Sequence, residues 1–410
     1  MRCVAVTGIG LVTPLGHSTG EVFESACAGR SAVRPFVNEV TARLRSPLAA
    51  TVQFDAAEHF DVQQQRLFDR VTQFAVVAAR RAIADASVAL SNFDPERVGV
   101  FLGTGMAGTT SMDDGYRTLY GEASDRIKPT LILQGMHNAP AAWIGIEHCL
   151  TGPNLTYSTA CSSSGVAIGE AWLRVASGSV DLAFAGGSEA PLALGSMKAW
   201  EAMHTLAVSD LAAPSTSCKP FSKNRTGMVL GEGSAIVILE SMDAAMARNA
   251  TIYGELIGYG LTTDSSHIAR PSVQGQAAAM RAALRSAGIT ADEVDSINAH
   301  GTGTLANDAA ETAAIKSVFG ARASAVPVSA TKAIHGHLLG AAAALECVLA
   351  LLAMQHRIAL PTMHLEQPDP DCDIDYVPKR ARPGAAGNIM LSNSFAFGGT
   401  NAVLVLRASQ

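Results

Sequence analysis

Cys161 is the residue of this chain best suited to nucleophilic chemistry. Residues 157–160 (YSTA) have the pattern of a strand, and residues 162–171 (SSSGVAIGEA) have that of a helix. The thiol is therefore predicted to lie in a sharp turn at a helix N-terminus, where the helix dipole and free N–H groups lower a thiol pKa. The same N–H groups can hold an oxyanion when a thioester is attacked. A buried structural cysteine, the commoner role of a single thiol, is the alternative.

Three polar motifs in the C-terminal half supply further candidates. The motif NAHGTGT places His300 at the end of a strand, and SATKAIHGHLLG places Lys332 and His337 at the end of another. The motif NSFAFGGTN is a glycine-rich turn around Phe397. Because α/β sheets build their sites in the loops at strand ends, these motifs are predicted to converge with Cys161 on one pocket.

Strands and helices that alternate along the chain must position these motifs. Short runs rich in Val and Ile alternate with Ala-rich stretches of helical period, which indicates an α/β protein with parallel or mixed sheets. Two runs in the first half, VAVTGIGLVT and VGVFLGTG, resemble GELIGYGLTT and VDSINAHGTG in the second. The strand before Cys161 likewise corresponds to the strand before Lys332. Three correspondences in the same order predict two similar halves, residues 1–250 with the cysteine and residues 251–410 with the two histidines and the lysine.

Two motifs of other classes give weaker signals. GTGMAG at residues 103–108 fits the G-x-G-x-x-G pattern of dinucleotide sites, but the segment that follows is polar and glycine-interrupted, and no acidic residue follows a second strand. A tight turn beside a pocket is the better interpretation, which disfavours a nucleotide-binding dehydrogenase. His335 and His337 could bind a metal, but no thiol or third ligand is near them in sequence, so we expect no metal site.

Composition excludes several further classes. Of 410 residues, 48% are hydrophobic and 16% charged, which excludes a disordered chain and favours a permanent subunit interface. A net charge of −6 without blocks of like charge argues against a nucleic-acid-binding face. Seven scattered cysteines indicate neither disulfides nor zinc, and no signal peptide is apparent, so a reducing cytoplasm is expected. The apolar residues 338–354 contain Glu346 and predict a buried helix, not a membrane span.

With these motifs, the chain resembles a β-ketoacyl-acyl-carrier-protein synthase of the elongating type, in the thiolase-like superfamily. The resemblance runs from VAVTGIG near the N-terminus to NAVLV near the C-terminus. It implies a five-layered α-β-α-β-α fold of two duplicated halves and a dimer, either of identical subunits or with a similar second subunit. The implied reaction is a decarboxylative Claisen condensation of a cysteine-bound acyl chain with malonyl-acyl-carrier protein, which extends a fatty-acyl, polyene or polyketide chain by two carbons. No cofactor is implied, because the phosphopantetheine arrives on the carrier protein.

The resemblance also implies a role for each candidate residue. Cys161 is the nucleophile, and His300 and His337 stabilise the charge on the malonyl thioester oxygen. Lys332 orders the site with Glu346 as its acidic partner, a pairing that the spacing alone does not establish. The backbone N–H groups of Cys161 and Phe397 form the oxyanion hole, and the substrate-binding residues are Thr302, Thr304, Phe397 and Met106. The family pattern gives His335 no role, and an exposed turn residue is expected there.

The chain departs from the family pattern at three places. Ala396 stands where glycine is usual, Thr226 replaces a usual aspartate, and the sequence ACSSS around Cys161 is closer to polyketide ketosynthases. Alanine at position 396 is unfavourable only if that residue needs a positive φ. A dedicated polyene or polyketide pathway is therefore open.

Two alternative functions and one docking surface also follow from these residues. A biosynthetic thiolase acting on coenzyme A thioesters would need a second cysteine near the C-terminal glycine loop, and a non-catalytic, chain-length-determining partner subunit would lack the nucleophile. Because carrier proteins of this type are acidic, an enzyme of net charge −6 needs a basic patch near its pocket. The candidate residues for that patch are Arg66, Arg126, Lys128 and Lys198.

Overall fold

One strand order occurs twice in the main sheet. The structure, a computed structural model, describes residues 1–37, 41–210 and 212–409. Along the sheet the first half contributes the order β5-β4-β6-β7-β1, and the second half contributes β10-β9-β13-β14-β8. The strands are β1 (Val4–Val12), β4 (Val98–Gly103), β5 (Asn154–Tyr157), β6 (Leu182–Glu189), β7 (Gly233–Ser241), β8 (Gly254–Thr263), β9 (Ser296–Asn298), β10 (Val328–Ser329), β13 (Ile389–Phe395) and β14 (Thr400–Ala408).

The strand directions repeat as well. In each half the first two pairings in this order are parallel and the next two are antiparallel. The three sequence correspondences are the strand pairs β1 and β8, β4 and β9, and β5 and β10. A short antiparallel pairing of β1 with β8 joins the two five-stranded halves edge to edge.

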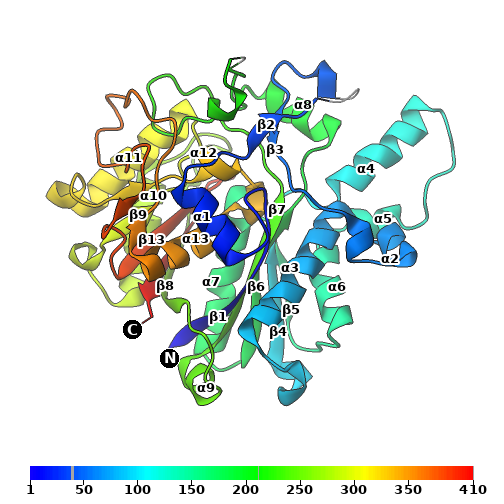
Figure 1. Ribbon diagram of the computed structural model, residues 1–410, viewed down its shortest axis with the longest axis horizontal. Coiled ribbons are helices and arrows are strands. Elements are labelled where there is room, and N and C mark those ends of the chain that lie inside the picture. The colour runs from blue at the N-terminus through cyan, green and yellow to red at the C-terminus, as the bar shows by residue number, and fades with distance from the viewer. Residues whose placement is uncertain (38–40, 211, 410) are drawn as a thin grey trace.

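Helices cover both halves and separate them in the middle (Figure 1). Helices α3 (Arg70–Ala86) and α6 (Ala139–Glu147) pack on the outer face of the first half. Helix α10 (Val273–Ala287) packs on the outer face of the second half, with α11 (Leu305–Phe319) against it. Between the halves lie α7 (Ser163–Ala176) and α13 (Ala342–His356). The predicted α-β-α-β-α layering is confirmed.

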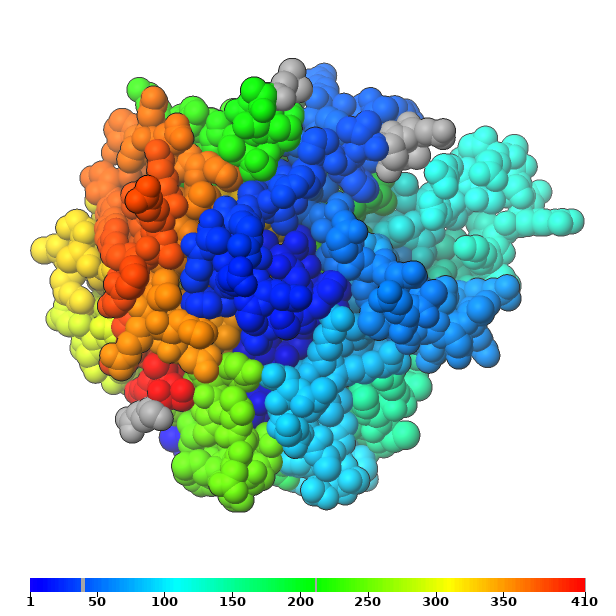
Figure 2. Space-filling model, viewed as in Figure 1, coloured from blue at the N-terminus to red at the C-terminus, as the bar shows by residue number. Residues whose placement is uncertain are grey.

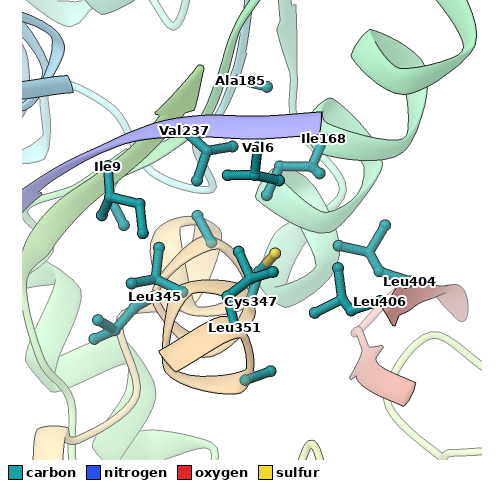
Figure 3. Packing of buried hydrophobic residues seen from close by; sticks show 14 of the residues in the cluster. Val6, Ile9, Ile168, Ala185, Val237, Leu345, Cys347, Leu351, Leu404 and Leu406 are labelled. Carbon is teal, nitrogen blue, oxygen red and sulfur yellow. The ribbon is translucent and has the colours of Figure 1, made fainter. Parts of the chain in front are cut away.

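Helix α13 is the centre of the core. Leu345, Cys347 and Leu351 lie between Val237 of the first half and Leu404 of the second (Figure 3). In the described part of the chain, Leu339–His356 is the one segment long and apolar enough to cross a membrane, and 89% of it is buried in the fold. The segment is apolar on all sides because the helix is enclosed by both halves of the fold.

Helix α3 shows how local sequence produces an outer layer. The Asp69 side chain caps its N-terminus by accepting a hydrogen bond from the N–H of Val71, and Ser87 ends it in a left-handed conformation. Alanines on its inner face allow a close approach to β1, where a Cβ on Gly10 would lie 1.8 Å from the carbonyl oxygen of Ala78. The remaining elements are α1 (Thr19–Cys27), α2 (Val62–Leu67), α8 (Leu194–Ala202), α9 (Met242–Ala247), α12 (Lys332–His335), β2 (Val33–Pro35), β3 (Leu48–Ala50), β11 (Ile358–Ala359) and β12 (Arg382–Pro383).

A segment of the first half stands out from the body. Helix α4 (Thr109–Tyr116), a π-helical turn (Arg117–Gly121) and the chain that leads to α5 (Leu131–Gly135) form a projection, drawn in cyan at the right of Figure 2. Tyr120 and Ile132 are more than two-thirds exposed there. The sequence did not predict α4, because its residues are polar and include Gly115.

Candidate active site

The turn between β5 and α7 holds Cys161 in a constrained backbone. Ala160, directly before it, has φ +51°, a left-handed conformation that costs a non-glycine residue on the order of 1 kcal/mol. The hydroxyl of Ser162 donates to the carbonyl of Thr159 at 3.0 Å, and that of Ser163 to the carbonyl of Ala160 at 2.6 Å. Ser164 accepts the Ala344 N–H at 3.0 Å and so fastens this turn to α13. The serines after the cysteine therefore build the turn, which lies at a helix N-terminus as predicted.

The prediction of a lowered thiol pKa is wrong for the free protein. Cys161 is 6% exposed, and its burial raises the thiol pKa to about 12. Nearby Lys332 and the backbone N–H groups of Phe397 and Cys161 oppose the shift, but they do not overcome the loss of hydration. Those two N–H groups point at the sulfur, and this is the geometry that an oxyanion hole beside Cys161 requires.

His300 follows β9 and is fixed through its backbone. The carboxylate of Glu311, on α11, accepts the N–H of His300 at 2.8 Å and that of Gly301 at 2.9 Å. The Lys332 ammonium lies 3.3 Å from His300 Nδ1. Burial and this cation hold the imidazole pKa well below its usual value, so His300 is neutral. A neutral ring that accepts at Nδ1 carries its proton on Nε2.

His337 reaches the same tautomer by another route. Its Nδ1 accepts the backbone N–H of Leu339 at 3.1 Å, and its buried Nε2 has no hydrogen-bond partner among the residues that the structure describes. Burial lowers its pKa well below the usual value. The ring centroids of His300 and His337 are 5.5 Å apart, and the two ring planes make an angle of 82°. Both histidines therefore present Nε2–H donors, which suits a developing negative charge.

Cys161, His300 and His337 could be taken for a metal site, because one ligand atom from each lies within 4.8 Å of the others. A metal needs the Nε2 lone pair, and the ligating ring then gives its other N–H to an acceptor. Here each Nδ1 faces a donor, either the Leu339 N–H or the Lys332 ammonium. The hydrogen bonds thus favour binding of an anion over binding of a metal.

Lys332 and Glu346 form a buried ion pair. Both side chains are inaccessible to solvent, and the lysine Nζ donates to Glu346 Oε1 at 2.5 Å and to the His300 carbonyl at 2.5 Å. Burial raises the pKa of Glu346 to about 7, and the lysine opposes the shift. The pairing that the spacing left open is present in the structure.

The expectation of an exposed His335 is wrong. The residue is fully buried, and its Nε2 lies 3.0 Å from the hydroxyl of Thr331. Gly336, the next residue, has φ +71°, and its backbone lies close to Ala50 and to the carbonyl oxygen of Val229. Burial accordingly lowers the pKa of His335 to about 3.

A pocket with room for about 240 Å³ opens over these groups. Cys161, both histidines, Thr302, Thr304 and Phe397 line it, so the structure brings together most of the predicted site. The two threonine hydroxyls are 2.9 Å apart. Ala396 also lines the pocket and is not among the residues with positive φ, so this conformation accommodates alanine.

Met106, a predicted substrate-binding residue, is not among the residues that line this pocket and lies in the glycine turn after β4. Its side chain packs against the apolar cluster that includes Cys161. The N–H groups of Gly105 and Met106 donate to the Glu189 carboxylate at 2.6 and 2.9 Å. A nucleotide phosphate would need such donors, so the turn is not a dinucleotide site although α4 follows it.

None of the four cations predicted for the carrier patch lines this pocket. Arg126 and Lys128 are exposed on the projection, Arg66 is exposed on α2, and Lys198 pairs with Glu201 at 2.6 Å. Arg270, which the sequence analysis did not single out, is exposed and lines the pocket. The patch therefore remains a prediction.

Comparison with known proteins places this site in a family. The family model for the N-terminal domain of β-ketoacyl synthases matches residues 1–245, and that for the C-terminal domain matches residues 253–366. The chain belongs to the β-ketoacyl synthase family. It is similar over 99% of its length to Nodulation protein E of Rhizobium meliloti (40% identity, 99% of that protein) and to 3-oxoacyl-[acyl-carrier-protein] synthase 2 of Coxiella burnetii (40%, 98%). The structure of the ishigamide ketosynthase/chain length factor is similar at a TM-score of 0.93 and 32% identity, with both chains fully covered.

Two buried carboxylates of this β-ketoacyl synthase escaped the sequence analysis. Glu189 ends β6 and Glu311 lies within α11, and both accept backbone N–H groups of loops that line the site. A carboxylate at the end of a largely apolar, fully buried strand, as in LAFAGGSE, was the available signal for Glu189. The Thr226 hydroxyl accepts the N–H of Val208 at 3.0 Å, and nothing in the structure explains its departure from the usual aspartate.

Proposed function

We propose that the protein elongates carrier-bound acyl chains by two carbons through decarboxylative Claisen condensation. The observation that carries this proposal is the placement of two neutral Nε2–H donors beside a buried nucleophilic thiol in one pocket. The reaction has two half-steps, and each uses a different part of that pocket.

In the first step, Cys161 takes the acyl group. Its sulfur forms a bond to the acyl carbon, the thioester bond to pantetheine breaks, and the thiol proton ends on the released pantetheine sulfur. The oxyanion of the tetrahedral intermediate accepts the N–H groups of Cys161 and Phe397. Because the resting thiol is protonated, it loses its proton as it attacks.

In the second step, malonyl-carrier protein loses carbon dioxide. The electron pair of the broken C–C bond passes to the thioester enolate, whose oxygen accepts hydrogen bonds from His300 and His337. The enolate carbon forms a bond to the acyl carbon of the acyl-cysteine, the C–S bond breaks, and the leaving Cys161 sulfur takes up one proton from solvent. Lys332 and Glu346 act as positioning residues, because the lysine holds His300 in its Nε2–H tautomer.

The arriving arm meets Thr302 and Thr304, whose hydroxyls suit the amides of phosphopantetheine. The proposed chemistry needs no other cofactor, since the thioester itself delocalises the carbanion. A thiolase is disfavoured because Cys161 is the only cysteine among the residues described as lining the pocket. A partner subunit without activity is disfavoured by the presence of the complete set of reacting groups.

A dimer, formed through the edge of the sheet, belongs to the proposal. Within the described chain β5 pairs with β4 alone, which leaves one edge of β5 open. Leu155 on that strand is 40% exposed, and Ile146 on neighbouring α6 is 61% exposed. An open edge beside apolar surface is suited to pairing with a second chain, either a copy or a similar subunit. We place the protein in the cytoplasm, where its seven free cysteines stay reduced.

The test supplies acyl- and malonyl-carrier protein and reads the product by mass spectrometry. Wild type is expected to release a 3-oxoacyl chain two carbons longer, and Cys161→Ala is expected to release none. Cys218→Ala is the matched control, because Cys218 is also buried but does not line the pocket. Elongation by the Cys161→Ala variant would refute the assignment.

A further inference from the structure

The ring of Phe397 lies against the indole of Trp200. Their ring centroids are 5.8 Å apart and the two ring planes make an angle of 19°, which is the geometry of an offset stack. The backbone N–H of the same Phe397 points at the Cys161 sulfur. One residue thus connects an aromatic pair, through its side chain, with the oxyanion hole, through its backbone. Acyl transfer uses the N–H group, whereas the ring and its partner have no role assigned so far.

Trp200 is the fixed member of the pair. Its helix, α8, is held by Glu201, whose carboxylate accepts the backbone N–H of Arg45 at 2.6 Å. The indole packs against the apolar cluster that contains Cys161. Trp200 itself is not among the residues that line the pocket. Its contact with Phe397 is therefore its connection to the space in which the substrate reacts.

Phe397 is the movable member, because the turn that follows it is built of glycine. Gly398 and Gly399 have φ +84° and +78°, a region that glycine enters at little cost. Gly398 is exposed, and a Cβ at this position would find no atom within 4 Å. The backbone hydrogen bonds from this turn to the neighbouring loop are made by Gly398 with Ile268 and by Gly399 with Asp264. The stack on the indole is thus a constraint that acts on Phe397 directly.

We propose that Trp200 is a positioning residue, whose indole holds the Phe397 ring and thereby keeps the Phe397 N–H directed at the place where the oxyanion of acyl transfer forms. This inference rests on the proposed function and adds a residue to its first step. An oxyanion-hole donor is effective when it is aligned before the charge develops. Without the stack, the N–H of Phe397 spends part of its time misaligned, and the barrier to acylation includes the cost of realigning it.

The experiment measures acylation of Cys161 by an acyl-pantetheine thioester over a range of concentrations, followed by intact-protein mass spectrometry. Trp200→Leu should lower the saturating rate by about tenfold, a factor that corresponds to about 1.4 kcal/mol, the size of one aromatic pair. The concentration that gives half of the saturating rate should stay the same, because Trp200 does not line the pocket. Alkylation of Cys161 by iodoacetamide, which forms no oxyanion, should not fall. Trp200→Phe, which can still stack on Phe397, should retain most of the acylation rate.

A second variant removes the other ring of the pair. Phe397→Leu keeps the backbone N–H and should lower the acylation rate by a similar factor. The double variant with Trp200→Leu should lose little more than either single variant, because both substitutions break the same contact. Trp143→Leu is the matched control, since Trp143 is also half-buried and packs on Phe68 at a centroid distance of 4.7 Å, but in a different apolar cluster. It should keep the wild-type acylation rate.

An unchanged acylation rate in Trp200→Leu, an equal loss of acylation and alkylation, or additive losses in the double variant would overturn the inference while leaving acyl transfer to Cys161 intact. An unchanged acylation rate in Phe397→Leu would overturn it even if Trp200→Leu did not fold. Absence of acylation of the wild type, by carrier-bound and pantetheine thioesters alike, would instead overturn the proposed function.

Discussion

Glu189 and Gly340 join the two halves of the chain directly behind the nucleophile. Oε2 of the buried Glu189 accepts the backbone N–H of Gly340 at 2.9 Å, and the same oxygen accepts that of Gly105 at 2.6 Å. One carboxylate thus fixes the turn that contains Met106 to the turn that follows His337. The two turns are also close-packed, since a Cβ on Gly340 would lie 2.3 Å from the nitrogen of Gly105.

Replacing Glu189 by Gln should therefore destabilise the fold. The amide has the same shape, but its NH2 group must face at least one backbone donor that the carboxylate now accepts. We expect a loss of about 1–3 kcal/mol in the free energy of unfolding, measured by denaturant titration. Glu24→Gln, at an exposed ion pair with Arg30, should change it by less than about 0.5 kcal/mol. Equal effects of the two substitutions would contradict the role of Glu189.

The alkylation rate of Cys161 by iodoacetamide should rise with pH without a plateau below pH 9. A thiol pKa of about 12 leaves about one molecule in ten thousand as thiolate at pH 8, and that fraction grows about tenfold per pH unit. Peptide mass spectrometry gives the rate for each cysteine, with buried Cys218 as the internal reference for an inaccessible thiol. A plateau near neutral pH would show that the helix N-terminus, not burial, governs this thiol.

Alanine at His300 or His337 should slow decarboxylation more than acylation. The enolate needs both Nε2–H donors, whereas the acylation oxyanion uses backbone N–H groups. By analogy with the removal of one oxyanion-hole donor, release of carbon dioxide from malonyl-carrier protein should fall by about 10²–10³-fold. The readout is labelled carbon dioxide beside acyl-enzyme formation, and near-normal release in both variants would refute the assigned roles.

The Lys332–Glu346 pair should behave as a unit in a double-mutant cycle. Lys332→Met alone leaves the buried Glu346 carboxylate unpaired, and Glu346→Leu alone leaves the buried lysine ammonium unpaired. Each substitution should therefore lower the free energy of unfolding by about 3–5 kcal/mol. The double variant should be more stable than either single one, because neither charge is left unpaired. Additive losses would mean that the two groups do not interact.

Carrier recognition should depend on Arg270 more than on the cations of the projection. Charge reversal at Arg270, which lines the pocket, should raise the KM for carrier-bound substrate and weaken its dependence on salt. Arg126→Glu and Lys128→Glu, whose residues do not line the pocket, test the sequence-based patch in the same assay. Unchanged KM in all three variants would remove both surfaces from the docking model.

Local patterns in the sequence were sufficient for the α/β class, the two similar halves and the candidate residues, whereas the five-layered fold and the role of each residue followed from the family resemblance. The strand-turn-helix around Cys161 and the strand ends at His300 and His337 are encoded within short stretches, and the internal repeat implies their convergence. Features that depend on distant segments were not predictable in this way. The segment that contains the buried His335 packs, through Gly336, against Ala50 and Val229, which are distant in sequence, and the raised Cys161 pKa depends on how completely the surrounding layers exclude water.

The seam between β1 and β8 has a local twofold axis. Val4 pairs with Leu256, Ala5 with Glu255 and Val6 with Gly254, so the pairing is symmetric about positions that correspond in the internal repeat. Two separate copies of a half-length ancestor would meet in this way in a symmetric homodimer. Such an ancestor would have carried two equal sites, whereas in the fused chain one copy is free to keep the thiol and the other is free to supply the histidine hydrogen-bond donors. The two halves of the single chain thus relate to each other as the two different subunits of a heterodimer do.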